Sequence, residues 1–264
     1  MMLHVRQYAR AAAAAAEVSL RHTIRDPFVL FTFLIYPLIV ALLGLWMLRD
    51  RGGNYAIFVV VGSGMTGLWS GVLTVSGNNI TGERWTGTLE LLVGSPTPLP
   101  VIVFGKNLAN VVLSFSAMLA SYTLVSLVLG YPLRVEQPGL FAASIVFALI
   151  SYVAFGLILA PLWLVNPEVR AWQNALEFPV YILGGFLFPI ALLPGWTTPL
   201  SYVLAPYWAA RALHGASSGG AGLAEIAFSW TMMLLLSVVY AIIALRLFRV
   251  MLRKVRVDAT LGLE

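Results

Sequence analysis

Residues 55–76 read YAIFVVVGSGMTGLWSGVLTVS, a run that carries no charged side chain. A transmembrane helix needs roughly 20 consecutive apolar residues, so this run predicts a membrane span. Charge returns in the adjoining stretch, GNNITGERWTGTLELLVGSP at residues 77–96. The chain therefore leaves the bilayer there, and a polar connection separates this span from the next apolar run.

Composition extends this prediction to the whole chain. Of its 264 residues, 60% are hydrophobic and 10% are charged, whereas a soluble domain carries about 25% charged residues. The chain is therefore a membrane protein. Cysteine is absent and there are only three histidines. The absence of cysteine excludes disulfides and thiolate metal sites. With only three histidines as well, we expect no metal site, no catalytic site and no cofactor in this chain.

Six segments are long and apolar enough to cross a bilayer. They cover residues 28–48, 55–76, 101–129, 140–165, 175–193 and 226–248. The sequence thus predicts an all-α polytopic membrane protein with one transmembrane domain over residues 1–264. An interfacial helix at residues 1–27 precedes the six-span bundle at 28–248, and a basic tail at 249–264 completes the chain. Because charges occur at Arg6 and Arg10 before any apolar core, we expect no cleavable signal peptide.

The distribution of basic residues predicts the orientation. Six spans place both termini on one side, and 16 residues of the chain are Lys or Arg. Four of them lie on the far side, namely Arg49, Arg51, Arg134 and Arg211, and the other twelve lie on the side of the termini. Cytoplasmic loops carry the excess of Lys and Arg. We therefore expect a multi-pass protein of the inner (plasma) membrane, with both termini and the 77–106 connection in the cytoplasm and no role in nucleic-acid binding.

The N-terminal segment predicts an amphipathic helix in the membrane interface. Its charged residues recur at multiples of about four and form one stripe; they are Arg6, Arg10, Glu17, Arg21 and Arg25. Asp26-Pro27 ends the helix, because a residue before proline avoids the α conformation. Packing of the same helix on its own bundle is compatible with this prediction.

Two glycine motifs resemble nucleotide-binding loops without being such loops. Gly62-Ser-Gly-Met-Thr-Gly67 matches G-x-G-x-x-G, but it lies inside an apolar span and not between a strand and a helix. We interpret these glycines as points of close helix packing. Gly105-Lys106-Asn107 lacks the first glycine and the final Ser or Thr of a phosphate-binding loop.

The polar connection predicts one short amphipathic helix over residues 83–94. At 100° per residue, one face is apolar and holds Trp85, Leu89 and Leu92. The opposite face is acidic and holds Glu83, Gly87, Glu90 and Gly94. A glycine inside a helix costs about 1 kcal/mol relative to alanine, so we expect another surface to approach Gly87 closely. From the residues alone, a docking surface and an ordinary solvated connector both stay open.

Two blocks of sequence resemble the ABC-2 type permeases, which are membrane subunits of ATP-driven exporters. The first block is similar to the cytoplasmic signature of the family and comprises Glu83-Arg84, Gly87-Thr-Leu-Glu90, Leu92, Ser95-Pro96 and Gly105-Lys106. The second is similar to the family's broken fifth span and the segment after it, and comprises Gly185-Phe-Leu-Phe-Pro189, Leu193-Pro-Gly-Trp196, Leu204-Ala-Pro-Tyr-Trp208 and Arg211-Ala-Leu213. The blocks stand in the expected order, although Trp85-Thr86 departs from the more charged residues that are common in the family.

This resemblance implies a non-catalytic permease of an ABC exporter. ATP and Mg would bind to a separate ATPase subunit, and residues 83–94 would be the coupling helix that docks on it. The residues so implied are Glu83, Arg84, Gly87, Thr88, Leu89 and Glu90. A second, weaker contact comprises Glu168 and Arg170, in a segment that also fits a plain helix start. Two ATPase copies and a second permease, identical or different, would complete the assembly. Its substrate would be an amphipathic drug, a lipid or a lipid-linked glycan.

The fifth span carries the candidates for a gate or pathway. Pro179 and Pro189 interrupt it. At its outer end Pro189, Pro194, Pro199 and Pro206 break the helices, which predicts re-entrant segments near the outer face, with Trp196, Tyr202, Tyr207 and Trp208 at the membrane interface. The candidate residues are Glu177, Phe188, Pro189 and Tyr207. Glu177 either lines a cytoplasmic gate, pairs with an arginine of the N-terminal helix, or reaches lipid headgroups.

Two other functional classes are open to a chain of this composition. A secondary transporter driven by an ion gradient needs ionisable groups within the membrane, and Glu177 is the one candidate that the predicted spans supply. A membrane enzyme needs a cluster of His, Asp or Glu near one face, and the sequence shows none.

Overall fold

The computed structural model describes residues 2–27, 31, 35–47, 53–129, 134–165 and 173–258, and these residues contain helices and no strand. The long helices are α1 (Met2–Arg25), α4 (Gly53–Gly71), α7 (Leu99–Leu129), α8 (Pro138–Val165) and α12 (Leu223–Asp258). The shorter ones are α3 (Tyr36–Met47), α5 (Asn79–Trp85), α6 (Leu89–Val93), α9 (Gln173–Leu183), α10 (Thr198–Tyr202) and α11 (Ala205–Ser218). A π-helix, η3 (Val72–Ser76), continues α4, and two 3-10 turns, η5 (Ile190–Leu192) and η6 (Gly195–Thr197), precede α10.

Four of the six predicted spans have a helix long and apolar enough to cross a membrane. These helices cover Tyr55–Trp85, Leu99–Leu127, Pro138–Leu164 and Leu223–Lys254. The first predicted span contains the shorter apolar helix Tyr36–Met47, and several of its other residues lie outside the described part of the chain. The fifth predicted span overlaps α9, whose 11 residues extend only about 16 Å. This length is too short to cross a bilayer core of about 30 Å. An all-helical architecture is confirmed for the described part of the chain, while the count of six spans stays a prediction.

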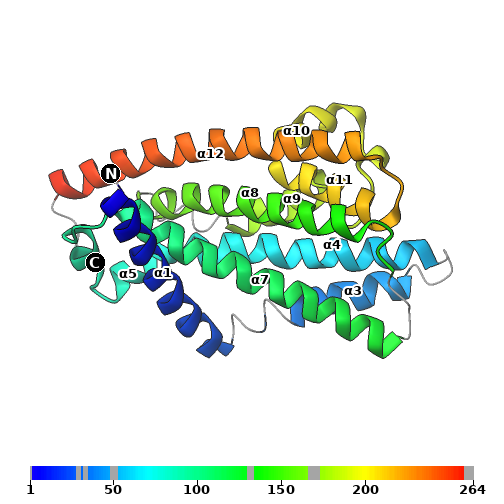
Figure 1. The fold of residues 1–264 in the computed structure, drawn as a ribbon, viewed down its shortest axis with the longest axis horizontal. Helices are drawn as coiled ribbons and strands as arrows, with labels where there is room; N and C mark the ends of the chain where they lie inside the picture. The colour runs from blue at the N-terminus through cyan, green and yellow to red at the C-terminus, as the bar shows by residue number, and fades with distance from the viewer. Residues whose placement is uncertain are drawn as a thin grey trace.

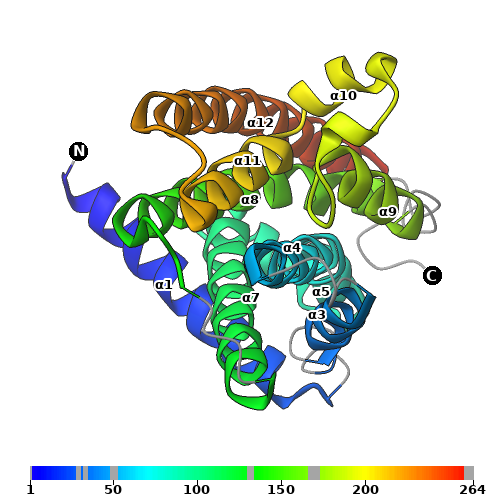
Figure 2. The same cartoon turned by 90° about the vertical axis from the view of Figure 1, so that its right-hand side faces the viewer.

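The long helices form one elongated bundle, with different features at its two ends (Figure 1). The start of α1, the helices α5 and α6 and the last turns of α12 lie at one end, which we call the α5 end. Helices α10 and α11 lie at the other, the α10 end. Helix α4 runs through the middle, with α3, α7, α8, α9 and α11 around it (Figure 2). The apolar stretch that begins in α4 is almost wholly buried.

The glycines of α4 are points of close packing, as the sequence predicts. A Cβ atom at Gly62 would overlap the backbone carbonyl of Phe186, and one at Gly67 would overlap the ring of Pro37. A Cβ atom at Gly64 would overlap the side chain of Met118. Small residues let helices approach each other in a membrane, so this motif serves packing in the centre of the bundle.

Helix α1 has the predicted charged stripe and also packs on the bundle. Arg6, Arg10 and Arg25 are exposed, whereas Ser19 and Thr23 are buried. At the crossing with α7, the backbone of Ala12 lies so close to Gly105 that a Cβ atom there would overlap it. The helix ends at Arg25, immediately before the predicted stop at Asp26-Pro27.

The fifth predicted span is broken, but at a different residue from the one expected. Helix α9 continues through Pro179 and ends at Leu183, where Gly185 takes a positive φ of 68°. The left-handed conformation suits glycine, so Gly185, and not Pro179, ends the helix. Pro189 lies beyond this turn in extended backbone. The chain then forms short turns and α11, which packs on α4, α8 and α12 at the α10 end.

A π-helix ends the second predicted span, and the last helix extends past the span predicted for it. The π-helix η3 continues α4, and the backbone N–H of Gly77 donates to the carbonyl of Val72 at 3.2 Å, five residues back. At the other end of the chain, α12 continues to Asp258. The first ten residues of the predicted tail therefore continue the helix of the last span.

Candidate functional site

The polar connection between α4 and α7 consists of two short helices, not one. The sequence predicts a single helix over residues 83–94, whereas the structure has α5 over Asn79–Trp85 and α6 over Leu89–Val93. The chain turns between them at Thr86, Gly87 and Thr88. We call residues 79–94 the α5–α6 connection.

Gly87 is the reason for this division. Its φ is 71°, a left-handed conformation that costs a residue with a Cβ atom roughly 1–2 kcal/mol. A Cβ atom at Gly87 would meet nothing within 4 Å. The glycine therefore permits a turn, and the described residues of this chain do not make the close approach to Gly87 that the sequence predicts.

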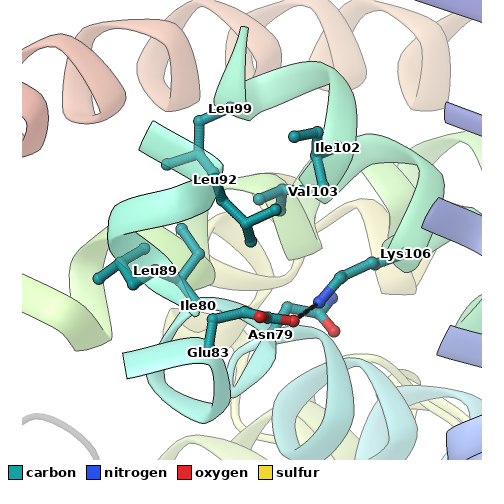
Figure 3. Close-up of a pocket in the computed structure, with 9 residues that line it drawn as sticks. All are labelled: Asn79, Ile80, Glu83, Leu89, Leu92, Leu99, Ile102, Val103 and Lys106. Atoms are coloured by element: carbon teal, nitrogen blue, oxygen red, sulfur yellow. Dashed lines mark hydrogen bonds and ion pairs between the residues drawn. The ribbon is translucent and has the colours of Figure 1, made fainter. Parts of the chain in front are cut away.

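The underside of the connection packs on the bundle through an apolar cluster (Figure 3). Leu89 is 2% exposed, and the cluster that contains it draws on α5, α6, α7, α8 and α12. Its buried members are Ile80, Leu89, Leu99, Val103, Ala160, Leu164, Phe248 and Met251. Leu92 packs against the cluster as predicted, and the pocket between these side chains leaves no space for a water molecule. The connection is thus fixed to the ends of three long helices.

Glu83 lies on the inner side of the connection and not on an open acidic face. Its carboxylate accepts from Lys106 Nζ, an ion pair between α5 and α7, and from Thr88 Oγ1 across the Gly87 turn. Figure 3 shows Glu83 and Lys106 pointing toward each other. The side chains of the pair are only 12% and 22% exposed. Glu83 therefore holds the connection together, which the helical projection did not predict.

The outer side of the connection carries exposed apolar groups beside an acid. Trp85 is 66% exposed and Leu91 is 74% exposed, while Glu90 is exposed and Arg84 is half-buried. Trp85 was predicted on the same apolar face as Leu89, and the turn at Gly87 separates the two. Among the described residues, the exposed surface of the connection thus comprises Trp85, Glu90 and Leu91, together with Thr86, Gly87 and Gly94.

A chain of amide hydrogen bonds lies behind the connection, and sequence reasoning missed it. Asn79 Nδ2 donates to Asn107 Oδ1 at 2.6 Å, and Asn110 Nδ2 donates to Asn79 Oδ1 at 3.5 Å. Asn110 Oδ1 in turn accepts from Ser19 at 3.2 Å and Thr23 at 3.5 Å. Both α7 asparagines are buried. Asparagine within an otherwise apolar span is the signal that could have revealed these bonds, since such side chains bond between helices.

The remaining predicted residues do not gather with the α5–α6 connection. Glu168 and Arg170 lie outside the described residues. Glu177 on α9 accepts a hydrogen bond from Tyr181 Oη, and that hydroxyl also lies 3.2 Å from the carbonyl of Thr66. Thr66 is on the central helix α4, so Tyr181 Oη lies between Glu177 and that helix, and Glu177 has a hydrogen-bond donor on its own helix.

The other gate candidates lie at the α10 end. Phe188 is half-buried and Pro189 is exposed, while Tyr207 is 7% exposed. Tyr207 packs in a group with Tyr202 and Trp208, with ring centroids 5.0–5.5 Å apart. Tyr207 and Trp208 are buried because α11 packs into the bundle, whereas Trp196 and Tyr202 are exposed. The position of these four aromatics at the membrane interface stays a prediction.

Comparison with known families agrees with this architecture. The family model of the ABC-2 type transporter matches residues 13–216, well over half of the chain. The match spans most of α1, the α5–α6 connection, the broken fifth span and nearly all of α11. No curated protein is similar enough to count as a match. Permeases of this family are membrane subunits, generally non-catalytic, that normally work with an ABC ATPase. The chain belongs to the ABC-2 type transporter family and is a membrane permease of an ABC transporter.

Proposed function

We propose that this permease belongs to an ATP-driven exporter and that the α5–α6 connection is where the ATPase subunit docks. The observation that carries the proposal is the two-sided structure of the connection. Leu89 on its inner side is 2% exposed, whereas Trp85 and Leu91 on its outer side are 66% and 74% exposed. A segment fixed to the bundle on one side and apolar on the other is suited to transmit force from a partner.

The outer side has the chemistry of a protein interface. Large aromatic residues supply much of the binding energy at such interfaces, and charged neighbours set their specificity. Trp85 and Leu91 supply the apolar area, and Glu90 supplies a charge for a basic group on the ATPase. Arg84, Gly87 and Thr88 shape the turn that presents them, while Glu83 and Leu89 anchor it. Glu168 and Arg170 remain a second proposed contact with the ATPase.

Movement of the connection would reach the spans through polar contacts. The Glu83–Lys106 pair ties α5 to α7, and the asparagine chain ties α5 to α7 and α1. A ligand shifts a conformational equilibrium only by binding one state more tightly. ATP and Mg on the ATPase would supply that difference, and the contacts of α5 would convert it into helix movement.

The proposed assembly contains two ATPase copies and two permeases, identical or different, in the inner (plasma) membrane. The α5 end faces the cytoplasm and the α10 end faces outward. Glu177, Phe188, Pro189 and Tyr207 remain proposed gate or pathway residues. The substrate class is an amphipathic drug, a lipid or a lipid-linked glycan, moved from the cytoplasm or the inner leaflet.

Co-purification with the ATPase tests the docking surface. The permease is expressed together with its ABC ATPase, and the amount of ATPase retained and its ATP hydrolysis in vesicles are measured. Because Trp85 and Glu90 face outward, Trp85→Ala and Glu90→Arg should each lower the amount of retained ATPase at least about tenfold. Both variants should keep the unfolding temperature of the unaltered permease.

Trp196→Ala is the matched control, since Trp196 is 73% exposed but lies at the α10 end. It should retain the ATPase fully. Full retention by Trp85→Ala and Glu90→Arg together would contradict the docking surface. Transport that continues without any ATPase would contradict the ATP-driven exporter and favour coupling to an ion gradient.

A further inference from the structure

An apolar groove lies on the outside of the bundle near the α5 end. It has a volume of about 250 Å³ and runs between α7, α8 and α12. Its lining is entirely apolar and consists of Pro100, Val101, Phe104, Leu157, Ala241, Ala244, Leu245 and Phe248. Phe248 also belongs to the buried cluster beneath the α5–α6 connection. The groove therefore adjoins the part of the molecule that holds this connection in place.

The groove is on the opposite side of the bundle from α3 and α9. Figure 2 shows α7, α8 and α12 on one side of α4, with α3 and α9 on the other. In a membrane, a groove facing outward meets lipid tails. Lipid tails are as apolar as leucine, so the groove by itself favours no lipid over another. Charge near its mouth must decide which lipid stays.

Basic residues continue the line of the groove along α12. Leu245 lines the groove, and Arg249 is one helical turn further toward the α5 end, on the same face. Arg246, Arg253 and Lys254 are exposed on the same turns, and no Asp or Glu occurs from residue 241 to 254. Helix α1 crosses α7 at Gly105, next to Phe104 of the groove, and exposed Arg10 lies two residues from that crossing.

We propose that this groove binds one anionic phospholipid of the leaflet at the α5 end. One acyl chain lies along Phe104, Leu157 and Leu245, and the phosphate of the headgroup contacts Arg249 and its basic neighbours. A basic group near a membrane surface contributes to the attraction of anionic lipid. The bound lipid joins α12 to α7 and α8 beside the apolar cluster. It is a resident structural lipid, distinct from any transported substrate.

Native mass spectrometry of the purified full chain in detergent tests this proposal. The chain is mixed with phosphatidylglycerol or with phosphatidylcholine that carries the same acyl chains. We expect one phosphatidylglycerol to be retained and phosphatidylcholine to be retained several-fold less. Arg249→Gln should weaken phosphatidylglycerol binding about fivefold and leave phosphatidylcholine unchanged. Leu245→Trp, which fills the groove with an apolar group, should lower retention of both.

Arg134→Gln is the control for charge, because exposed Arg134 lies just before α8, at the α10 end. It should bind phosphatidylglycerol normally, and all variants should unfold at the same temperature in lipid-free detergent. Equal retention of the two lipids, or equal loss in Arg249→Gln and Arg134→Gln, would overturn the proposal. A dimer of the chain that dissociates in Leu245→Trp would also overturn it, since a second copy would then fill the groove.

Discussion

Glu83 and Glu90 show how two residues of one type, seven positions apart, differ in role. Glu83 pairs with Lys106 and Thr88 on the inner side of the connection, whereas Glu90 is exposed on the outer side. Loss of the Glu83 carboxylate leaves a mostly buried lysine without its acid, which is a cost to folding. Loss of the Glu90 carboxylate changes the surface alone. Of the two, only Glu90 reports cleanly on partner docking.

Gly87 should tolerate asparagine better than alanine. Its φ of 71° is costly for most residues but is tolerated by asparagine. Gly87→Ala should therefore lower the free energy of unfolding by about 1–2 kcal/mol, and Gly87→Asn by less. Thermal unfolding of the purified permease in detergent measures both.

Gly82 supplies the matched control for this substitution. It too has open space around it, but it lies inside α5, where alanine is the better helix former. Gly82→Ala should be neutral or stabilising. Equal destabilisation by Gly82→Ala and Gly87→Ala would show that the positive φ is not what matters at residue 87.

At the scale of elements, α1 is a part of the bundle as well as an amphipathic helix. Its charged residues face outward, while Ser19 and Thr23 bond to Asn110 of α7. The backbone contact between Ala12 and Gly105 brings the two helices close enough for these bonds. Movement of the α5–α6 connection must therefore move or strain α1 as well.

Gly105→Leu should separate α1 from α7. A side chain at residue 105 would overlap the backbone of Ala12, so α1 must shift and expose its inner face. The chain has no cysteine, and a single introduced thiol therefore reports without background. Ser19→Cys, at a position that is 8% exposed, should react slowly with a water-soluble thiol reagent. It should react several-fold faster in the Gly105→Leu background.

Val18→Cys is the control for this labelling experiment. Val18 is the neighbour of Ser19 on α1 and is 64% exposed, so the introduced thiol should react quickly with or without Gly105→Leu. If the reactivity of Ser19→Cys were the same in both backgrounds, the packing of α1 on α7 would be contradicted.

At the scale of the whole molecule, hydropathy predicted the bundle because membrane burial depends on local composition. Runs of apolar residues placed the second, third, fourth and sixth spans within a few residues of where their helices begin. The site was less predictable. The ion pair between Glu83 and Lys106 joins residues 23 apart in sequence, and helical projection assumed an unbroken helix that Gly87 interrupts. Contacts between helices depend on how the helices pack, and the amphipathic pattern of one segment carries no information about that packing.

The proposed orientation can be tested with two leucines of nearly equal exposure. Leu91, at the α5 end, is 74% exposed and Leu192, beyond the break at Gly185, is 73% exposed. In cells that express the permease alone, a membrane-impermeant thiol reagent should label Leu192→Cys directly. It should label Leu91→Cys only after permeabilisation, since the excess of Lys and Arg predicts that this end lies in the cytoplasm. Labelling of Leu91→Cys in intact cells would contradict this topology.

The π-helix at Val72–Ser76 sets the angular phase of the chain that continues from it. A π-turn accommodates one more residue than an α-turn, and one residue corresponds to about 100° of rotation. Deleting one of these five residues would restore an α-helix and leave the span almost as long. Because the π-turn already absorbs that extra residue, Asn79 and Glu83 would then keep nearly the same angle and still face Asn107 and Lys106. Deleting a residue of α4 outside η3 would instead rotate both by about 100°, away from these partners. For this permease, a one-residue deletion in the regular part of α4 should therefore disturb the α5–α6 connection far more than a one-residue deletion within the π-helix.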